Sequence, residues 1–378
     1  MGLTHFVYPG AMHTRFQHAI GASHLMSRAI NSLRLKGVEI SEHEEESAIL
    51  AVLMHDIGHG PFSHALEHSI VKNISHEQLS LLIMKRLNHE FDGMLDLAIR
   101  IYSGEYHKKF LNQLLVGQLD VDRLDYLRRD SFFTGVSEGA VGYERILKML
   151  NVVDDELVVE AKGIYSIEKF LISRRFMYWQ VYLHKTVLSA ENLLMKTLQR
   201  AKELAQNGVE LFATPPLHYF LYSNPGISEF NSGITSDNGD GPLDLFNLMD
   251  DNDIVTSIKY WVNHSDTILS TLSKSILNRQ LFAIEIEREH FPADYISKLQ
   301  SKAASQYKIN MENVHYFVFA DSITNYAYTI SDPKIKILMS TGNLVDISTA
   351  SDILNINILT SNVRKFFLMY PKTVDVDS

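Results

Sequence analysis

The chain has 378 residues, no cysteine and a formal net charge of −10 at pH 7, and 46% of its residues are hydrophobic. This length and composition are typical of a globular protein with one large domain or two smaller ones. The acidic balance argues against general nucleic-acid binding, the lack of cysteine excludes disulfides and cysteine-based metal sites, and no apolar run reaches the ~18 residues of a membrane-spanning helix. We therefore expect a non-membrane, cytoplasmic protein without a signal peptide.

The first half of the chain is predicted to be helical, because apolar residues recur at three- and four-residue spacing. The expected helices are residues 11–36, 42–57, 64–72, 76–88, 92–103, 110–132, 142–152 and 166–206. Only residues 152–159, ValValAspAspGluLeuValVal, indicate a strand or hairpin. The segment 166–206 is long and rich in aromatic residues, and most of these side chains are predicted to lie in a core helix pair.

The last third of the chain has a different pattern. Residues 231–243 are polar and rich in turn-forming residues, which predicts a surface loop. Beyond residue 280, four short runs alternate apolar and polar residues as strands do. These runs are residues 282–287, 316–321, 326–330 and 335–339. We therefore predict a mainly α fold, with a helical core over residues 1–206 and a smaller α+β region over residues 207–378.

Three short segments of the helical half contain candidate metal ligands. His18 ends the run ThrArgPheGlnHis, His55 and Asp56 follow an apolar run, and Asp122 lies in AspValAspArgLeuAspTyr. Imidazole nitrogens and carboxylate oxygens suit a divalent transition metal, and two of each leave positions open for water. Such a metal lowers the pKa of bound water and polarises a phosphoryl oxygen. The pattern therefore indicates hydrolysis of a phosphorylated small molecule.

The residues alone leave some assignments open. An isolated histidine such as His18 is more often structural than a ligand, and Asp120 and Asp125 compete with Asp122 for the fourth position. His55 and Asp56 are neighbours, which an ideal helix would splay by ~100°. Both reach one ion only if the helix ends there, as the Gly- and Pro-containing run that follows predicts.

Four segments together resemble the HD-domain phosphohydrolase superfamily, in particular its branch of deoxynucleoside triphosphate triphosphohydrolases. The segments are ThrArgPheGlnHis (14–18), HisAspIleGlyHisGlyProPheSerHis (55–64), SerHisGluGln (75–78) and AspValAspArgLeuAspTyr (120–126). They occur in family order within a resemblance that extends from residue 3 to about residue 200. The resemblance implies an HD-domain helical core that hydrolyses a deoxynucleoside triphosphate to a deoxynucleoside and triphosphate.

The resemblance also implies roles for individual residues. It implies one divalent ion (Fe, Mn, Zn, Ni or Mg) with four ligands, namely His18, His55, Asp56 and Asp122. The catalytic candidates are His59, His64, Glu67 and His76, of which Glu67 stands where the family has Asp. The candidates for phosphate binding are Arg15, Arg123, Arg174 and Lys185, each with a surface ion pair as the alternative. The candidates for sugar binding are Tyr126, Asp130 and Tyr182, since a tyrosine against the sugar excludes a 2′-hydroxyl.

Other functions and assemblies stay open at this point. The same metal site would support a nucleoside monophosphate phosphatase, and the fold could serve as a binding or assembly module without catalysis. A cyclic-dinucleotide phosphodiesterase is disfavoured, because residues 142–144 are GlyTyrGlu and not GlyTyrPro. The aromatic stretch 166–186 suggests a homodimer or higher homo-oligomer, unless the C-terminal region covers it.

The resembled family has further residues before the segment that starts this chain. We therefore expect either a truncated chain or a more open site. Residue 183 is Leu, whereas a mammalian relative has a base-contacting Gln. For both reasons, the preferred base and any activation by nucleotides do not follow from the resemblance.

Overall fold

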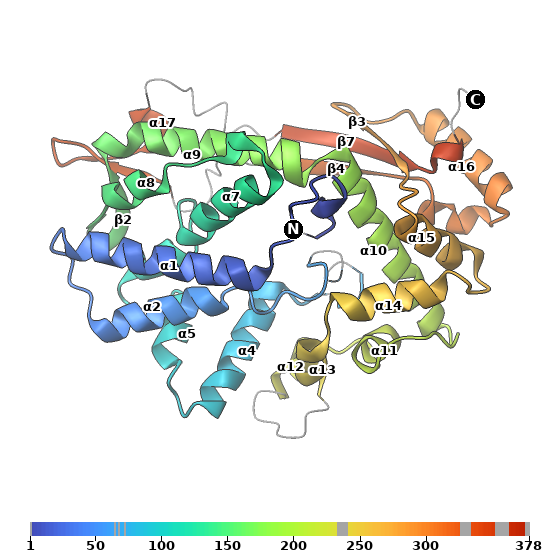
Figure 1. Ribbon diagram of the computed structural model, residues 1–378, viewed down its shortest axis with the longest axis horizontal. Helices are drawn as coiled ribbons and strands as arrows, with labels where there is room; N and C mark the ends of the chain where they lie inside the picture. The colour runs from blue at the N-terminus through green and yellow to red at the C-terminus, as the bar shows by residue number, and fades with distance from the viewer. Residues whose placement is uncertain are drawn as a thin grey trace.

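The computed structural model describes residues 2–63, 66, 69–71, 73–232, 241–325, 334–351 and 363–374. These residues form a mainly α-helical fold with two small sheets, which confirms the fold class predicted from the sequence. Figure 1 shows one group of helices from the N-terminal half of the chain and a second group around the long helix α10 (Lys185–Gln206). None of the described helices combines the length and the apolar character that crossing a membrane requires.

The first group of helices packs around one hydrophobic cluster that includes the fully buried Ile30 and Leu124. The members are α1 (Arg15–Arg34), α2 (Glu42–Met54), α5 (Asp96–Tyr102), α6 (Lys109–Leu115), α7 (Val121–Thr134), α8 (Tyr143–Met149) and α9 (Ile164–Met177). Thr14 and Ser41 begin α1 and α2 as capping boxes, which satisfy backbone N–H groups that a helix start leaves free. Capping and burial together fix where these helices begin.

The second group contains α10 and most of the C-terminal helices. Its members besides α10 are α4 (His76–Glu90), α11 (Pro215–Tyr222), α12 (Ile227–Ser232), α13 (Pro242–Leu248), α14 (Asp251–Trp261), α15 (Thr267–Leu277) and α16 (Ala293–Tyr307). Shorter helices among the described residues include η1 (Thr4–Phe6), η2 (Ser137–Gly139), η3 (Ala161–Gly163), η5 (Met311–Tyr316), α17 (Ile347–Ala350) and η6 (Lys372–Val374). α10 ends at residue 206 but packs in the same hydrophobic cluster as α11, α14 and α15, which follow that residue. The domain boundary at residue 206 stays a prediction.

Several predicted helices are divided in the structure. The pattern at 110–132 is two helices, α6 and α7, because Gly117 interrupts it and Asp120 caps a new start. The pattern at 166–206 is α9, a π-helical turn η4 (Tyr178–Tyr182) and α10. The helix predicted at 64–72 lies largely outside the described residues, as do residues 233–240 of the predicted loop.

The two sheets connect distant parts of the chain. The hairpin predicted near 152–159 is present as β1 (Leu150–Val153) and β2 (Glu156–Glu160). Parallel to β2 lies β5 (Lys336–Leu338), which pairs with β6 (Leu344–Asp346). The other sheet has β7 (Val363–Tyr370) between β3 (Ala283–Glu287) and β4 (Phe319–Asn325). The strand predicted at 326–330 lies outside the described residues.

The aromatic stretch 166–186 is largely covered within the chain. Phe170 and Val181 are fully buried in the first cluster. Lys365 of β7 lies over the ring of Trp179, with its Nζ 3.8 Å from the ring centroid. Phe176 is exposed. The apolar character of this stretch therefore no longer argues for a dimer, and self-association stays a prediction.

Replacing Glu44 with Gln tests how the first group is held together. Glu44 is buried on α2 and accepts hydrogen bonds from Tyr106 (2.6 Å) and Lys108 (2.8 Å). Burial raises its pKa, but the hydrogen bonds from Lys108, Tyr106 and Ser41 outweigh it and lower the pKa to about 2. We expect Glu44→Gln to reduce the free energy of unfolding by roughly 1–3 kcal/mol at pH 7, measured by urea denaturation.

The sign of the pH dependence follows from the lowered pKa. Ionised Glu44 stabilises the fold above its unfolded pKa of roughly 4.3, and this contribution is lost as the pH falls from there toward 2. The difference in stability between wild type and Glu44→Gln should therefore shrink over that range. Glu46→Gln, at an exposed position of the same helix, is the matched control. A difference that does not change with pH would contradict the assignment.

Candidate metal centre

His18 is held by two carboxylates at the start of α1. Its Nδ1 lies 2.8 Å from Oδ2 of Asp125, and its Nε2 lies 3.0 Å from Oδ1 of Asp122. A carboxylate only accepts hydrogen bonds, so Nδ1 carries the proton that Asp125 binds. Arg129 donates to both oxygens of Asp125, at 2.8 and 2.9 Å, and fixes that carboxylate. The imidazole therefore presents Nε2 as the nitrogen that could bind a metal ion.

His55 presents the same atom from the end of α2. Its Nδ1 donates to the carbonyl oxygen of Val52 at 2.6 Å. Its Nε2 is buried and makes no hydrogen bond to a described residue, and it lies 3.5 Å from a carboxylate oxygen of Asp56 and from one of Asp122. Helix α2 ends at Met54, and ligand atoms of the neighbours His55 and Asp56 lie within 4.8 Å of each other.

The three aspartates of the 120–126 run have different partners. Asp120 caps α7: it accepts from the backbone N–H of Arg123 (2.7 Å) and of Gly117 (2.8 Å) and pairs with the Arg123 guanidinium. Asp125 holds the far side of the His18 ring. Asp122 alone of the three places an oxygen near Nε2 of both His18 and His55. Backbone geometry thus separates candidates that the sequence left equal.

These side chains form a candidate metal site. Ligand atoms of His18, His55 and Asp56 lie within 4.8 Å of one another, and Asp122 approaches two of them. Burial lowers the pKa of His18, but hydrogen bonds and charges of Asp122 and Asp125 outweigh it and raise the pKa to about 10. Burial raises the pKa of Asp122, but the contacts with His18 and His55 outweigh it and hold this pKa well below its usual range. The pocket therefore stabilises positive charge, and two imidazole nitrogens with two carboxylates suit a divalent transition metal.

Arg15 lies beside this site in the first turn of α1. Its guanidinium donates to Oδ2 of Asp56 at 2.5 Å and to Oγ of Ser63 at 2.7 Å. The contact with Asp56 leaves the other oxygen of that carboxylate facing His55. Arg15 thus combines a fixed position with a side chain that is 40% exposed, which suits contact with an anionic ligand.

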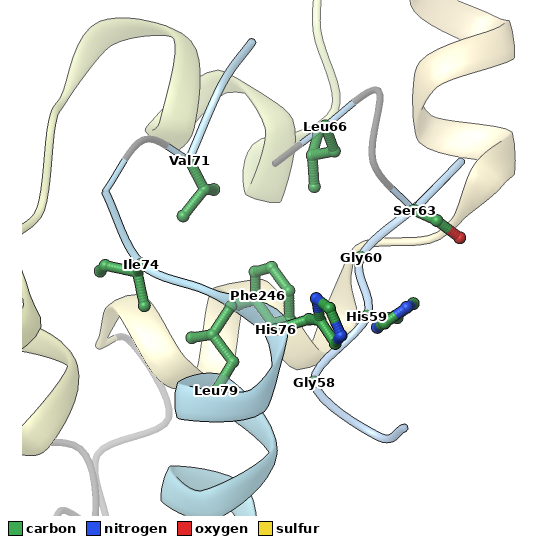
Figure 2. A pocket seen from close by; sticks show the side chains of 10 residues that line it. All are labelled: Gly58, His59, Gly60, Ser63, Leu66, Val71, Ile74, His76, Leu79 and Phe246. Atoms are coloured by element: carbon green, nitrogen blue, oxygen red, sulfur yellow. The ribbon is translucent and has the colours of Figure 1, made fainter. Parts of the chain in front are cut away.

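Two further histidines meet at the edge of the site. The ring centroids of His59 and His76 lie 3.8 Å apart and the rings are nearly perpendicular. Figure 2 shows both rings beside a small recess whose other walls are mostly apolar, among them Leu66, Leu79 and Phe246. His64 and Glu67, the other predicted catalytic residues, lie outside the described residues.

A cavity of 760 Å³ opens from the candidate metal site, within the range of roughly 300–1,000 Å³ common for small-molecule sites. It is lined by most of the described residues that the sequence analysis selected. These are Arg15, His18, Asp56, His59, His76, Asp122, Arg123, Tyr126, Asp130, Arg174 and Tyr182. His55 lies behind them, and Lys185 is exposed at the start of α10 and does not line the cavity.

Some of the basic residues and of the residues predicted to bind the sugar already make contacts within the protein. The guanidinium of Arg123 pairs with Asp120, so it is no solvated surface charge, while its buried Nε makes no hydrogen bond to a described residue. Arg174 is buried on α9. Asp130 is shared by two neighbours: Tyr182 donates to one oxygen at 2.6 Å, and Nε2 of His13 lies 2.7 Å from the other.

His13 and Tyr178 are among the residues of the cavity wall that the sequence analysis did not select. His13 stacks on Phe133, with ring centroids 4.5 Å apart, and holds Asp130. Tyr178 packs edge-on against Tyr182 from within the π-helical turn. The sequence predicts most aromatic residues of 166–206 to lie in the core, and their spacing carries no sign of the π-helical turn from which Tyr178 and Tyr182 line the cavity.

The comparisons with known proteins agree with this architecture. Residues 15–130 match the family model of the HD domain, and residues 141–213 match that of the HD associated region. The chain is similar to a phosphohydrolase from Bacteroides thetaiotaomicron whose crystal structure is 52% identical, with a TM-score of 0.91 over 98% of this chain and 90% of that chain. The fold and the site thus define the HD class of phosphohydrolase.

Relatives known by sequence extend the comparison. The uncharacterized protein YwfO of Bacillus subtilis is 30% identical over 100% of this chain and 85% of its own length. The deoxynucleoside triphosphate triphosphohydrolase SAMHD1 homolog of Dictyostelium discoideum is 32% identical over 54% of this chain. This chain spans only 43% of that relative. The chain belongs to the HD-domain phosphohydrolase superfamily, as its motifs indicated.

Proposed function

We propose that this protein is a metal-dependent hydrolase that cleaves deoxynucleoside triphosphates to deoxynucleoside and triphosphate. The observation that carries the proposal is the single cavity that joins the candidate metal site to three arginines and a group of tyrosines. Arginine grips phosphate in a bidentate manner, and the tyrosines offer planar faces to a sugar. Relatives named deoxynucleoside triphosphate triphosphohydrolase SAMHD1 support the same substrate class.

The proposed ion is held by His18, His55, Asp56 and Asp122. The donor set fits because both imidazoles have their Nδ1 occupied and direct Nε2 to the same place as the two carboxylates. A divalent ion bound there lowers the pKa of its water and polarises a phosphoryl oxygen. Which metal occupies the site is a matter for measurement, since nitrogen and oxygen ligands serve several ions.

The chain's own residues supply the rest of the proposed chemistry. Arg15, Arg123 and Arg174 neutralise the triphosphate as charge builds on its oxygens. Water adds to the α-phosphorus and loses a proton to solvent, the bond from this phosphorus to O5′ breaks, and O5′ takes up a proton. His59 and His76 line the same cavity and are proposed to supply it. The water oxygen leaves with the triphosphate.

The sugar is proposed to lie against the rings of Tyr126 and Tyr182, on the side that faces the cavity. The ring of Tyr182 is fixed because its hydroxyl donates to Asp130, and the two tyrosine rings meet edge to face with centroids 6.3 Å apart. A rigid ring against C2′ leaves no room for a hydroxyl there, which favours deoxyribose. Lys185 is the exposed first residue of α10 and stays a candidate for contact with the outer phosphates.

A product analysis tests the proposal. The purified chain is loaded in turn with Mn²⁺, Fe²⁺, Ni²⁺, Zn²⁺ or Mg²⁺ and incubated with deoxynucleoside and ribonucleoside triphosphates and with nucleoside monophosphates in ¹⁸O-water. We expect deoxynucleoside and ¹⁸O-labelled triphosphate, with little turnover of ribonucleotides. Inorganic phosphate from monophosphates alone would replace the proposal with a monophosphatase. Bound metal without any turnover would favour a binding module.

Asp125 is expected to control metal affinity without contacting the ion. Its carboxylate orients the His18 ring, and partners of this kind typically contribute 10–100-fold to metal affinity, so we expect Asp125→Asn to weaken metal binding by about that factor. Chelator competition measures the effect without any assay of activity. Asp92→Asn, at an exposed position, is the control, and equal affinity in both variants would remove Asp125 from this role.

A further inference from the structure

His13, two residues before α1, has a buried imidazole to which the proposed chemistry gives no role. Its side chain is 4% exposed and lines the cavity that opens from the candidate metal site. Its Nε2 lies 2.7 Å from Oδ1 of Asp130, and because a carboxylate only accepts hydrogen bonds, this nitrogen carries the proton. The other nitrogen, Nδ1, is buried and makes no hydrogen bond to a described residue. Among the described residues, Asp130 is thus the hydrogen-bonding partner of the imidazole.

The carboxylate of Asp130 connects His13 to Tyr182. The Tyr182 hydroxyl donates to Oδ2 at 2.6 Å, whereas His13 occupies Oδ1. The torsion that turns an aspartate carboxylate has only broad preferences of its own, so its orientation depends on the partners of both oxygens. Hydrogen bonds to an ionised carboxylate are also stronger than those between neutral groups. His13 therefore fixes the acceptor on which the position of the Tyr182 ring depends.

The segment that carries His13 is itself held in place at three points. The imidazole stacks on Phe133, with ring centroids 4.5 Å apart and an angle of 21° between the rings. A Cβ at Gly10 would clash with the backbone carbonyl oxygen of Phe133, so glycine permits the close approach of this segment to the end of α7. The hydroxyl of Tyr8 donates to the carbonyl oxygen of Gln180 at 2.7 Å. The segment thus contacts both α7 and the π-helical turn η4.

We propose that His13 is a positioning residue for Tyr182, acting through Asp130, and that it thereby enforces the preference for deoxyribose. The effect on sugar preference rests on the proposed function, in which the Tyr182 ring lies against C2′ and leaves no room for a hydroxyl. Steric exclusion of one oxygen atom requires a ring that does not move aside. The hydrogen bond from Tyr182 to a carboxylate that His13 holds supplies this restraint, without any contact between His13 and the reacting atoms.

Two substitutions of His13 separate its hydrogen bond from its packing. His13→Phe keeps an aromatic ring that can stack on Phe133 but donates no hydrogen bond. His13→Gln keeps an N–H group that can reach Asp130. The exposed His24 of α1 provides the control His24→Gln. For each variant, kcat/KM is measured with four matched pairs of deoxynucleoside and ribonucleoside triphosphates, and the deoxy-to-ribo ratio is compared with that of wild type.

The deoxy-to-ribo ratio should fall about tenfold or more in His13→Phe, since misplacing a contact in an active site by about 1 Å can change rates by this much. His13→Gln should keep most of the ratio, and His24→Gln all of it. Combining His13→Phe with Tyr182→Phe should change the ratio no further than Tyr182→Phe alone, because both substitutions act on one chain of hydrogen bonds. A lower melting temperature of His13→Phe with an unchanged ratio would show a purely structural histidine and overturn the proposal.

A spectroscopic measurement separates this inference from the proposed function. In protein labelled with 3-fluorotyrosine, the ¹⁹F resonance of Tyr182 is the one that is absent from Tyr182→Phe. We expect this resonance to shift or broaden in His13→Phe and to stay unchanged in His24→Gln. If it does so although wild type hydrolyses no triphosphate, then the proposed function fails and the positioning of Tyr182 by His13 stands. If wild type hydrolyses deoxynucleoside triphosphates but neither the resonance nor the deoxy-to-ribo ratio changes in His13→Phe, then the proposed function stands and His13 has no positioning role.

Discussion

Asp56→Ala and His55→Ala are each expected to abolish metal binding and hydrolysis while the helical core stays folded. Each substitution removes one of the four proposed ligands, namely one of the two that follow the end of α2. The proposed ion then loses a bond that no other described residue replaces. Partners outside the ligand shell already contribute 10–100-fold, so we expect the loss of a ligand to reduce metal affinity by more than about 100-fold. Metal content after gel filtration and product release measure the two effects.

A histidine of α2 that lies away from the candidate metal site provides the control variant. His43 is exposed in the first turn of α2, and His43→Ala should keep both metal and turnover. Circular dichroism should show the same helix content in all three variants, because alanine is the residue that helices tolerate best. Metal bound at wild-type stoichiometry and affinity by Asp56→Ala would remove Asp56 from the ligand set.

Asp120→Ala is expected to reduce mainly the stability of the fold and Asp122→Asn mainly the binding of metal, although the two positions are only two residues apart. Asp120 is buried, caps α7 and pairs with Arg123. Removing one partner of a buried ion pair typically costs 3–5 kcal/mol, and removing a helix cap adds to this, so Asp120→Ala should lower the stability by roughly that amount or more. The described contacts of Asp122 are with His18 and His55 at the candidate metal site, and Asp122→Asn should lose metal with a smaller loss of stability than Asp120→Ala.

Thermal unfolding monitored by circular dichroism and metal analysis on the same samples decide this comparison. The expected outcome is a large drop in melting temperature for Asp120→Ala, and loss of metal without such a drop for Asp122→Asn. If Asp122→Asn also unfolds early, the carboxylate has a structural role that its contacts do not show. If Asp120→Ala is stable but loses metal, the ligand assignment within the 120–126 run is wrong.

Local patterns in the sequence predict much of this structure. Thr14 and Ser41 with Gln17 and Glu44 three residues on are capping boxes, and their spacing alone predicts helix starts. The apolar run that ends in the Gly- and Pro-rich segment after Asp56 predicts the end of α2, and with it the joint orientation of His55 and Asp56. The alternation at 282–287 predicts β3. These features depend on residues close in sequence, which is why they can be read without a structure.

Contacts between distant residues decided the rest. The pairing of β5 with β2 places residue 336 beside residue 158, and no local pattern specifies such a parallel neighbour. The choice among Asp120, Asp122 and Asp125 depends on how α7 lies against α1 and α2. A Cβ at residue 2 would lie 3.0 Å from Oε1 of Glu191, so the start of the chain lies beside a helix nearly 200 positions away. The sequence by itself determined where most of the helical segments lie and which residue types could bind a metal. Tertiary packing decided where long patterns divide and which carboxylates meet, because hydrogen bonding and burial depend on residues that are distant in sequence.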